Sequence, residues 1–195
     1  DDVVTVTAED LPTLYHDAAM GRVFDLDELL EMAKQLTWSV SFTEFDGVSV
    51  SAAESFGMLT RLAARAIEEG NVPPGEACRY LDGPPRRVMA TESGFAAQRS
   101  DFEQAIIDAA SYMEQTGRLP DSLWAGEAIS PGDFITALAR VMPAVAEHGE
   151  LPATVDIRPA ELECQEHVSE EAAHRAWESV MMPDGFSAPK LLEQA

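Results

Sequence analysis

A register of matching residues recurs along this chain of 195 residues and limits what the chain can fold into. When the sequence is shifted by 79 residues, positions 50–73 align with 129–152 without a gap. The identical pairs are Ser51/Ser130, Leu59/Leu138, Arg61/Arg140, Glu68/Glu147, Gly70/Gly149 and Pro73/Pro152. These residues have the character of helix caps, helix stops and buried apolar positions. The match therefore predicts one backbone path that is used twice.

Each copy is predicted to begin with an amphipathic helix. In the first copy, leucines and an alanine recur at helical spacing between Leu26 and Leu36. In the second copy, Ser100 and Glu103 have the spacing of a capping box and precede a similar apolar face.

A short hairpin is predicted to follow this helix. In the first copy, Trp38–Phe42 alternates between apolar and polar residues, Thr43–Gly47 ends in the turn signal Asp-Gly, and Val48–Val50 returns. In the second copy the corresponding strands are shorter, at Ser122–Ala125 and Ala128–Ile129.

The second helix of each copy has a clear start signal. Ser51 and Glu54 form a predicted capping box. Ser130 and Asp133 resemble it, with Pro131 at the first helical position, where proline is tolerated.

The end of each copy is also marked in the sequence. Gly70 and Gly149 are predicted to stop the second helices as left-handed caps. The extended segments that follow, Glu76–Leu81 and Thr154–Ile157, are predicted to pair with the hairpins and so to form small sheets.

Together these elements predict an α+β fold that is mainly α, made of two tandem helix–hairpin–helix–strand repeats with flanking helices. The predicted divisions are an N-terminal strand and helix at 1–22, the first copy at 23–81, a linker at 82–99, the second copy at 100–160 and a C-terminal helical segment at 161–195. The flanking elements are a strand at Val3–Val6, a helix that begins after Thr7 and a helix at Ser169–Met182.

The net charge of the chain excludes some classes of binding partner. Thirty-five acidic residues against 13 lysines and arginines give a net charge of −22. Such a surface repels phosphate backbones and anionic lipids, so neither nucleic-acid binding nor membrane insertion is expected. No apolar stretch approaches the ~20 residues that a membrane-spanning helix needs. Cationic partners, metal ions and neutral glycans stay open.

Several residues are candidate ligand contacts. Phe45 and Trp124 occupy equivalent positions beside the two hairpin turns, and Arg79 and Arg158 are equivalent after the second helices. Together with Trp38, Tyr80 and Tyr112, the two aromatic residues could stack on sugar rings, or all five could fill the small cores beneath the hairpins. The arginines could instead anchor structure through carboxylates.

A metal site has weak support. Cys164 and His167 are three residues apart, and Cys78 could join them because both cysteines follow the ends of the copies. A zinc site needs four ligands, or three with a water, and no further ligand has suitable spacing. A buried cysteine and a surface histidine are the alternative, so no metal, cofactor or catalytic residue is predicted.

One stretch of the second copy resembles a known family. From Phe102 to Leu138 the chain runs through a helix, the turn Thr116–Pro120, a hairpin around Gly126 and the helix start Ile129–Pro131. This pattern resembles the pseudomurein-binding repeat, which is associated with attachment to archaeal cell walls. The first copy departs from it.

In that first copy, Trp38 and Ser41 stand where the second copy has Gly117 and Pro120. The resemblance implies a non-catalytic module that binds cell-wall glycan, in an extracellular or cell-envelope location. Without it, a cytoplasmic location is the expectation. The alternative function is a protein–protein interaction or oligomerisation domain of a larger protein, and a metal-dependent enzyme is the third.

Overall fold

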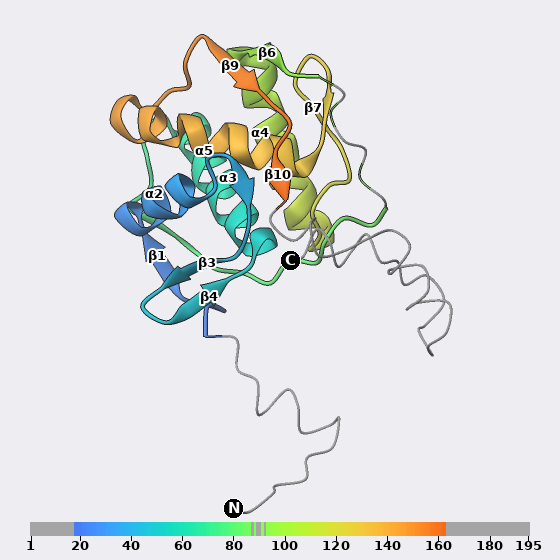
Figure 1. Ribbon diagram of the computed structural model, residues 1–195. Coiled ribbons are helices and arrows are strands. Elements are labelled where there is room, and N and C mark those ends of the chain that lie inside the picture. Colours follow the sequence, from blue (N-terminus) through green and yellow to red (C-terminus); the bar gives the residue numbers. More distant parts are fainter. Residues whose placement is uncertain (1–17, 87, 89–90, 92, 163–195) are drawn as a thin grey trace, which may run out of the picture.

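The computed structural model describes residues 18–86, 88, 91 and 93–162 (Figure 1). The predicted flanking strand at Val3–Val6, the helix after Thr7 and the helix at Ser169–Met182 lie outside these residues.

Within the described residues the fold consists of helices surrounded by short strand pairs (Figure 1). The helices are α2 (Leu26–Gln35), α3 (Ala52–Glu69), α4 (Arg99–Thr116) and α5 (Pro131–His148). Helix α3 packs against α4 and α5, and α2 packs against α5. The predicted class, α+β and mainly α, is confirmed.

The signals at the ends of the second helices act as predicted. Ser51 and Glu54 form a complete capping box at α3. The hydroxyl of Ser130 accepts a hydrogen bond from the backbone N–H of Asp133 at the start of α5. Helix α5 continues through Pro143. The two helices end at Gly70 (φ 68°) and Gly149 (φ 71°), both in the left-handed conformation.

The strands that close each unit do not pair with the hairpins, and this prediction was wrong. Instead β5 (Gly75–Ala77) pairs antiparallel with β1 (Val23–Asp25). In the same way β9 (Thr154–Ile157) pairs antiparallel with β6 (Phe95–Gln98). Neither partner strand was predicted, because each is short and runs directly into a helix. Strand β6 lies in the segment predicted to be a linker.

The start of α4 was also predicted wrongly. The cap residue is Gln98, not Ser100, and it makes no side-chain cap. The first N–H group, on Arg99, donates instead to the backbone carbonyl of Ala153 at 3.0 Å. The helix begins where β6 ends, so a main-chain acceptor replaces the expected capping box with Glu103.

The first hairpin lies further along the chain than its alternation suggested. Strand β3 (Thr43–Phe45) pairs with β4 (Val48–Val50) through Asp46 and Gly47, which both have positive φ. This two-residue loop fits the right-handed twist of the strands. The predicted strand Trp38–Phe42 is therefore wrong as a hairpin partner.

The second hairpin has a loop of three residues, one more than the first. Strand β7 (Leu123–Trp124) pairs antiparallel with β8 (Ala128–Ile129), and Gly126 between them has a φ of 90°.

Two further pairings link the units reciprocally. We call residues 23–82 the first unit and residues 95–162 the second unit, so that each includes the strands that the structure adds to the predicted copy. Strand β10 (Glu161–Leu162), at the end of the second unit, pairs in parallel with β2 (Ser39–Val40) of the first unit. Asp82, at the end of the first unit, bridges in parallel to Arg118 of the second. The residues of one pairing correspond to those of the other under the 79-residue shift. The end of each unit therefore pairs with the equivalent segment of the other unit.

The hydrogen bonds of these two pairings also correspond. The N–H of Asp82 donates to the carbonyl of Gly117 at 3.0 Å. The N–H of Glu161 donates to the carbonyl of Trp38 at 3.2 Å.

Two arginines repeat another bond. Arg61 donates to the carbonyl of Ala77 at 3.2 Å, and Arg140 donates to the carbonyl of Asp156 at 2.8 Å. The 79-residue shift relates these pairs as well. The duplication itself stays a prediction, and the matched caps, pairings and arginine bonds support it.

A single hydrophobic core joins the two units. The ring centroid of Phe134 lies 5.3 Å from that of Phe56 and 5.3 Å from that of Phe102. Phe56 belongs to the first unit, and the other two rings belong to the second. The units therefore bury their apolar faces against each other.

Thr60 provides a test of packing in α3. It is fully buried, and its hydroxyl is the one buried side-chain polar atom in the described part of the chain that lacks a hydrogen-bond partner. We expect Thr60→Val to raise the free energy of unfolding by about 1 kcal/mol, because an unsatisfied hydroxyl is replaced by a methyl group of similar size. Urea denaturation measures the change.

Thr136 in α5 is the matched control. It is equally buried, but its hydroxyl donates to the carbonyl of Asp133 at 3.1 Å. Thr136→Val should therefore give no gain. Equal effects of the two substitutions would contradict this account.

Candidate functional site

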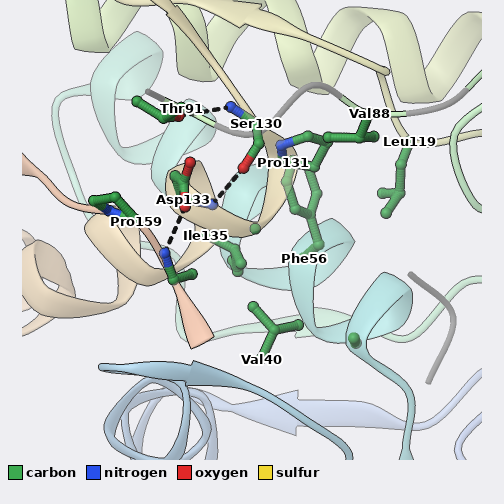
Figure 2. Close-up of a pocket in the computed structure, with 13 residues that line it drawn as sticks. Val40, Phe56, Val88, Thr91, Leu119, Ser130, Pro131, Asp133, Ile135 and Pro159 are labelled. Carbon is green, nitrogen blue, oxygen red and sulfur yellow. Dashed lines mark hydrogen bonds between the residues drawn. The ribbon is translucent and has the colours of Figure 1, made fainter. Parts of the chain in front are cut away.

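A cavity of about 230 Å³ lies between the first turns of α3 and α5 (Figure 2). Its walls are mostly apolar side chains. Val40 of β2 lies on one side of it, and Pro159 and Ala160 come from the segment that leads into β10.

The two units contribute equivalent positions to this cavity. The pairs of lining residues related by the 79-residue shift are Val40/Leu119, Ala52/Pro131 and Phe56/Ile135. We call this space the central cavity, because both members of each pair line it. A cavity with this lining lies where the two units meet.

The polar groups of the wall are bonded to each other or to nearby backbone (Figure 2). The hydroxyl of Ser130 accepts from the N–H of Asp133 at 3.0 Å, and the N–H of Ser130 donates to Thr91 Oγ1 at 3.4 Å. The buried carboxylate of Asp133 accepts from the N–H of Ala160 at 2.6 Å. These bonds orient the wall and leave apolar contact as the main interaction that the cavity offers.

A second hollow, of about 320 Å³, lies beside the start of α3. Phe42, Ser49 and Tyr80 are among its lining residues. Five lining residues correspond under the 79-residue shift to five that line the central cavity. These pairs are Ser51/Ser130, Ala53/Gly132, Glu54/Asp133, Tyr80/Pro159 and Leu81/Ala160. We call this space the aromatic hollow.

Phe45 and Trp124, the two predicted hairpin contacts, differ in their surroundings. Phe45 is half-buried and packs its ring edge-to-face on Phe24, with centroids 5.8 Å apart. Trp124 is 66% exposed. The structure therefore packs Phe45 against the core and leaves Trp124 accessible.

The predicted arginines pair with carboxylates. Arg79 lies 3.0 Å from Glu114, and Arg158 lies 2.5 Å from Asp156. All four side chains are more than half exposed, so each pair adds little stability. Tyr112 is half-buried on α4, away from any cavity described above.

Trp38 lies next to two guanidinium groups. Its ring centroid is 5.4 Å from Arg140 and 5.8 Å from Arg158, and its side chain is 58% exposed. Burial lowers the pKa of Arg140, and the nearby Arg158 lowers it further, against the opposing effect of Asp156. The arginine stays charged at neutral pH because its ordinary pKa is so high.

The metal candidates are not brought together in the described residues. Cys78 is buried, and its backbone pairs with Arg22 and Gly21. Cys164 and His167 lie outside the described residues. The part of the chain that the structure describes contains no group of three or more His, Cys, Asp or Glu residues placed to hold a metal ion.

Comparisons of the chain with protein-family models, with curated proteins and with solved structures find no match. Across the residues described above, no helix has both the length and the apolar character needed to cross a bilayer.

The central cavity was not predicted from the sequence. Its members were visible as repeated positions, and Ser130 and Asp133 were identified as cap residues. The missing information was that equivalent positions of the two units face each other. The 79-residue register can predict such a cavity only when the reciprocal strand pairing is also known.

Gly132 tests the free space in the central cavity. A Cβ atom added there would meet Val40, Ser130 and Ala160 at 3.7 to 3.9 Å, which is ordinary contact. We expect Gly132→Ala to raise the free energy of unfolding by about 1 kcal/mol, because alanine favours a helix and its methyl group fills empty space. Thermal or urea unfolding measures this.

Gly57 in α3 is the control, because there an added Cβ would collide with the side chain of Leu81 and lie 3.0 Å from Arg61 Nη1. Gly57→Ala should stabilise less or destabilise. Stabilisation by Gly57→Ala but not by Gly132→Ala would show that the cavity does not have this shape.

Proposed function

We propose that the chain is a non-catalytic binding module whose ligand is a protein segment with an apolar side chain that enters the central cavity. The observation that carries this proposal is the lining itself. Both units contribute apolar side chains to it, and the polar groups described there bond to the protein. The volume lies below the ~300–1,000 Å³ typical of sites for whole small molecules, and it suits a single side chain.

The serines beside the two hollows support a binding role over nucleophilic catalysis. A nucleophilic hydroxyl needs a base within hydrogen-bond distance. The described hydrogen bonds give neither Ser51 nor Ser130 a base as acceptor, and each hydroxyl accepts an N–H group, of Glu54 or Asp133, as a helix cap. Their position in the fold has a complete structural explanation.

Selection from a library of displayed peptides tests the proposal. We expect the enriched peptides to share one aliphatic or aromatic anchor residue. Gly132→Leu should weaken their binding at least tenfold, because the larger side chain occupies the cavity that the anchor needs. Ala96→Leu, on the exposed face of β6, is the control and should leave binding unchanged. Enriched peptides that bind Gly132→Leu as tightly as the original protein would refute the proposal.

Cell-wall glycan is the second candidate ligand, and the exposure of Trp124 favours it. An accessible indole ring offers a flat apolar surface of the kind that stacks on sugar rings. If this function holds, the protein should sediment with pseudomurein or another insoluble wall polymer, and Trp124→Ala should abolish most of the retention. Phe45→Leu is the control, because that ring is half-buried and packs on Phe24. Retention that survives Trp124→Ala would exclude this site as the glycan contact.

A further inference from the structure

Two aromatic side chains of the first unit stay exposed on the same hollow. Phe42 is 54% exposed and Tyr80 is 66% exposed, and both line the aromatic hollow. Large apolar side chains in contact with water add no stability through burial. A shared hollow lined by two such rings is therefore a candidate contact surface.

Tyr80 makes one hydrogen bond through its ring hydroxyl and one contact through its backbone. Its hydroxyl donates to Asp82 Oδ1 at 2.7 Å, and its backbone N–H lies 3.1 Å from Met20 Sδ. The hydrogen bond to Asp82 raises the pKa of Tyr80, with smaller contributions from burial and from the charges of Asp82 and Glu54, against the effect of Arg118. A phenol that donates to a carboxylate is richer in electrons, which strengthens its attraction for a cation.

The charges around the hollow are mostly negative. Glu54 is part of its lining. Glu44 lies directly across the hairpin from the lining residue Ser49, so the side chains of Glu44 and Ser49 project from the same face of the strand pair. Asp82 is next to Tyr80 and is paired with Arg118 at 3.0 Å. The chain as a whole carries −22, which attracts cations over a long range.

We propose that the aromatic hollow binds a lysine or arginine side chain of a basic polypeptide. The cation contacts the faces of Phe42 and Tyr80, and the surrounding carboxylates favour its approach. This inference rests on the proposed function, because both take the ligand to be a protein. It adds that the ligand protein is basic and contacts a second site, the aromatic hollow.

The second unit lacks this chemistry. At the positions of Phe42 and Tyr80 it has Asp121 and Pro159. The cation-binding site is therefore specific to the first unit, whereas residues of both units line the central cavity.

Binding of an octalysine peptide tests the inference on the full chain. The double substitution Phe42→Leu/Tyr80→Leu removes both rings and keeps the net charge. We expect it to weaken binding about tenfold at moderate salt, the loss that two exposed cation–π contacts would give. In the unsubstituted protein, the ring protons of Phe42 and Tyr80 should shift on titration. Trp124→Leu removes an equally exposed ring elsewhere and should leave the affinity unchanged.

Equal affinity of the double variant and the unsubstituted protein would overturn the inference, because octalysine would then be held by the overall charge alone. Circular dichroism of each variant checks that it is folded, and Phe42→Leu by itself, expected to lose about threefold, replaces the double variant if that one unfolds. Gly132→Leu separates the two proposals. It should weaken the binding of the selected apolar peptides at least tenfold and leave octalysine binding intact.

Discussion

The structure depends on the reciprocal pairing between the ends of the two units. The backbone bond from Asp82 to Gly117 and the corresponding bond from Glu161 to Trp38 place the end of each unit on the other. Neither unit completes its own set of main-chain hydrogen bonds in these segments, and buried or half-buried backbone groups need such partners. The same arrangement brings the aromatic rings of both units into one core. The two units thus share one hydrophobic core.

The central cavity follows from this arrangement. The reciprocal pairing brings β2 and the segment before β10 beside the first turns of α3 and α5, and these are the elements that line it. Phe56 packs against Phe134 and also lines the cavity, so the core and the site share a wall. A change in the core near this ring would therefore alter the site.

Local signals in the sequence were enough to predict much of the fold. The start and end of the second helices and the turn at Asp46–Gly47 depend on a few adjacent residues, and these were correct apart from the strand bounds. The pairing of β1 with β5 and of β6 with β9 depends on contacts between distant residues, and short strands carry too little alternation to reveal them.

Among the candidate sites, Trp124 and Phe45 differ in burial: Trp124 is accessible and Phe45 is packed. The repeat pattern in the sequence gives no information about this difference. Their equivalent positions beside a turn glycine predicted a common role. In the structure the ring of Phe45 packs on Phe24 of β1, whereas the ring of Trp124 is exposed. Equivalent positions therefore share a backbone path without sharing a function.

The lining of the central cavity has a consequence for molecular recognition. Matching positions supply only part of its wall, namely the pairs Val40/Leu119, Ala52/Pro131 and Phe56/Ile135. Other lining residues, among them Ser130 and Asp133, belong to the second unit, and their counterparts line the aromatic hollow instead. A ligand and the same ligand rotated by half a turn would therefore meet different surfaces, and this difference selects one direction of entry.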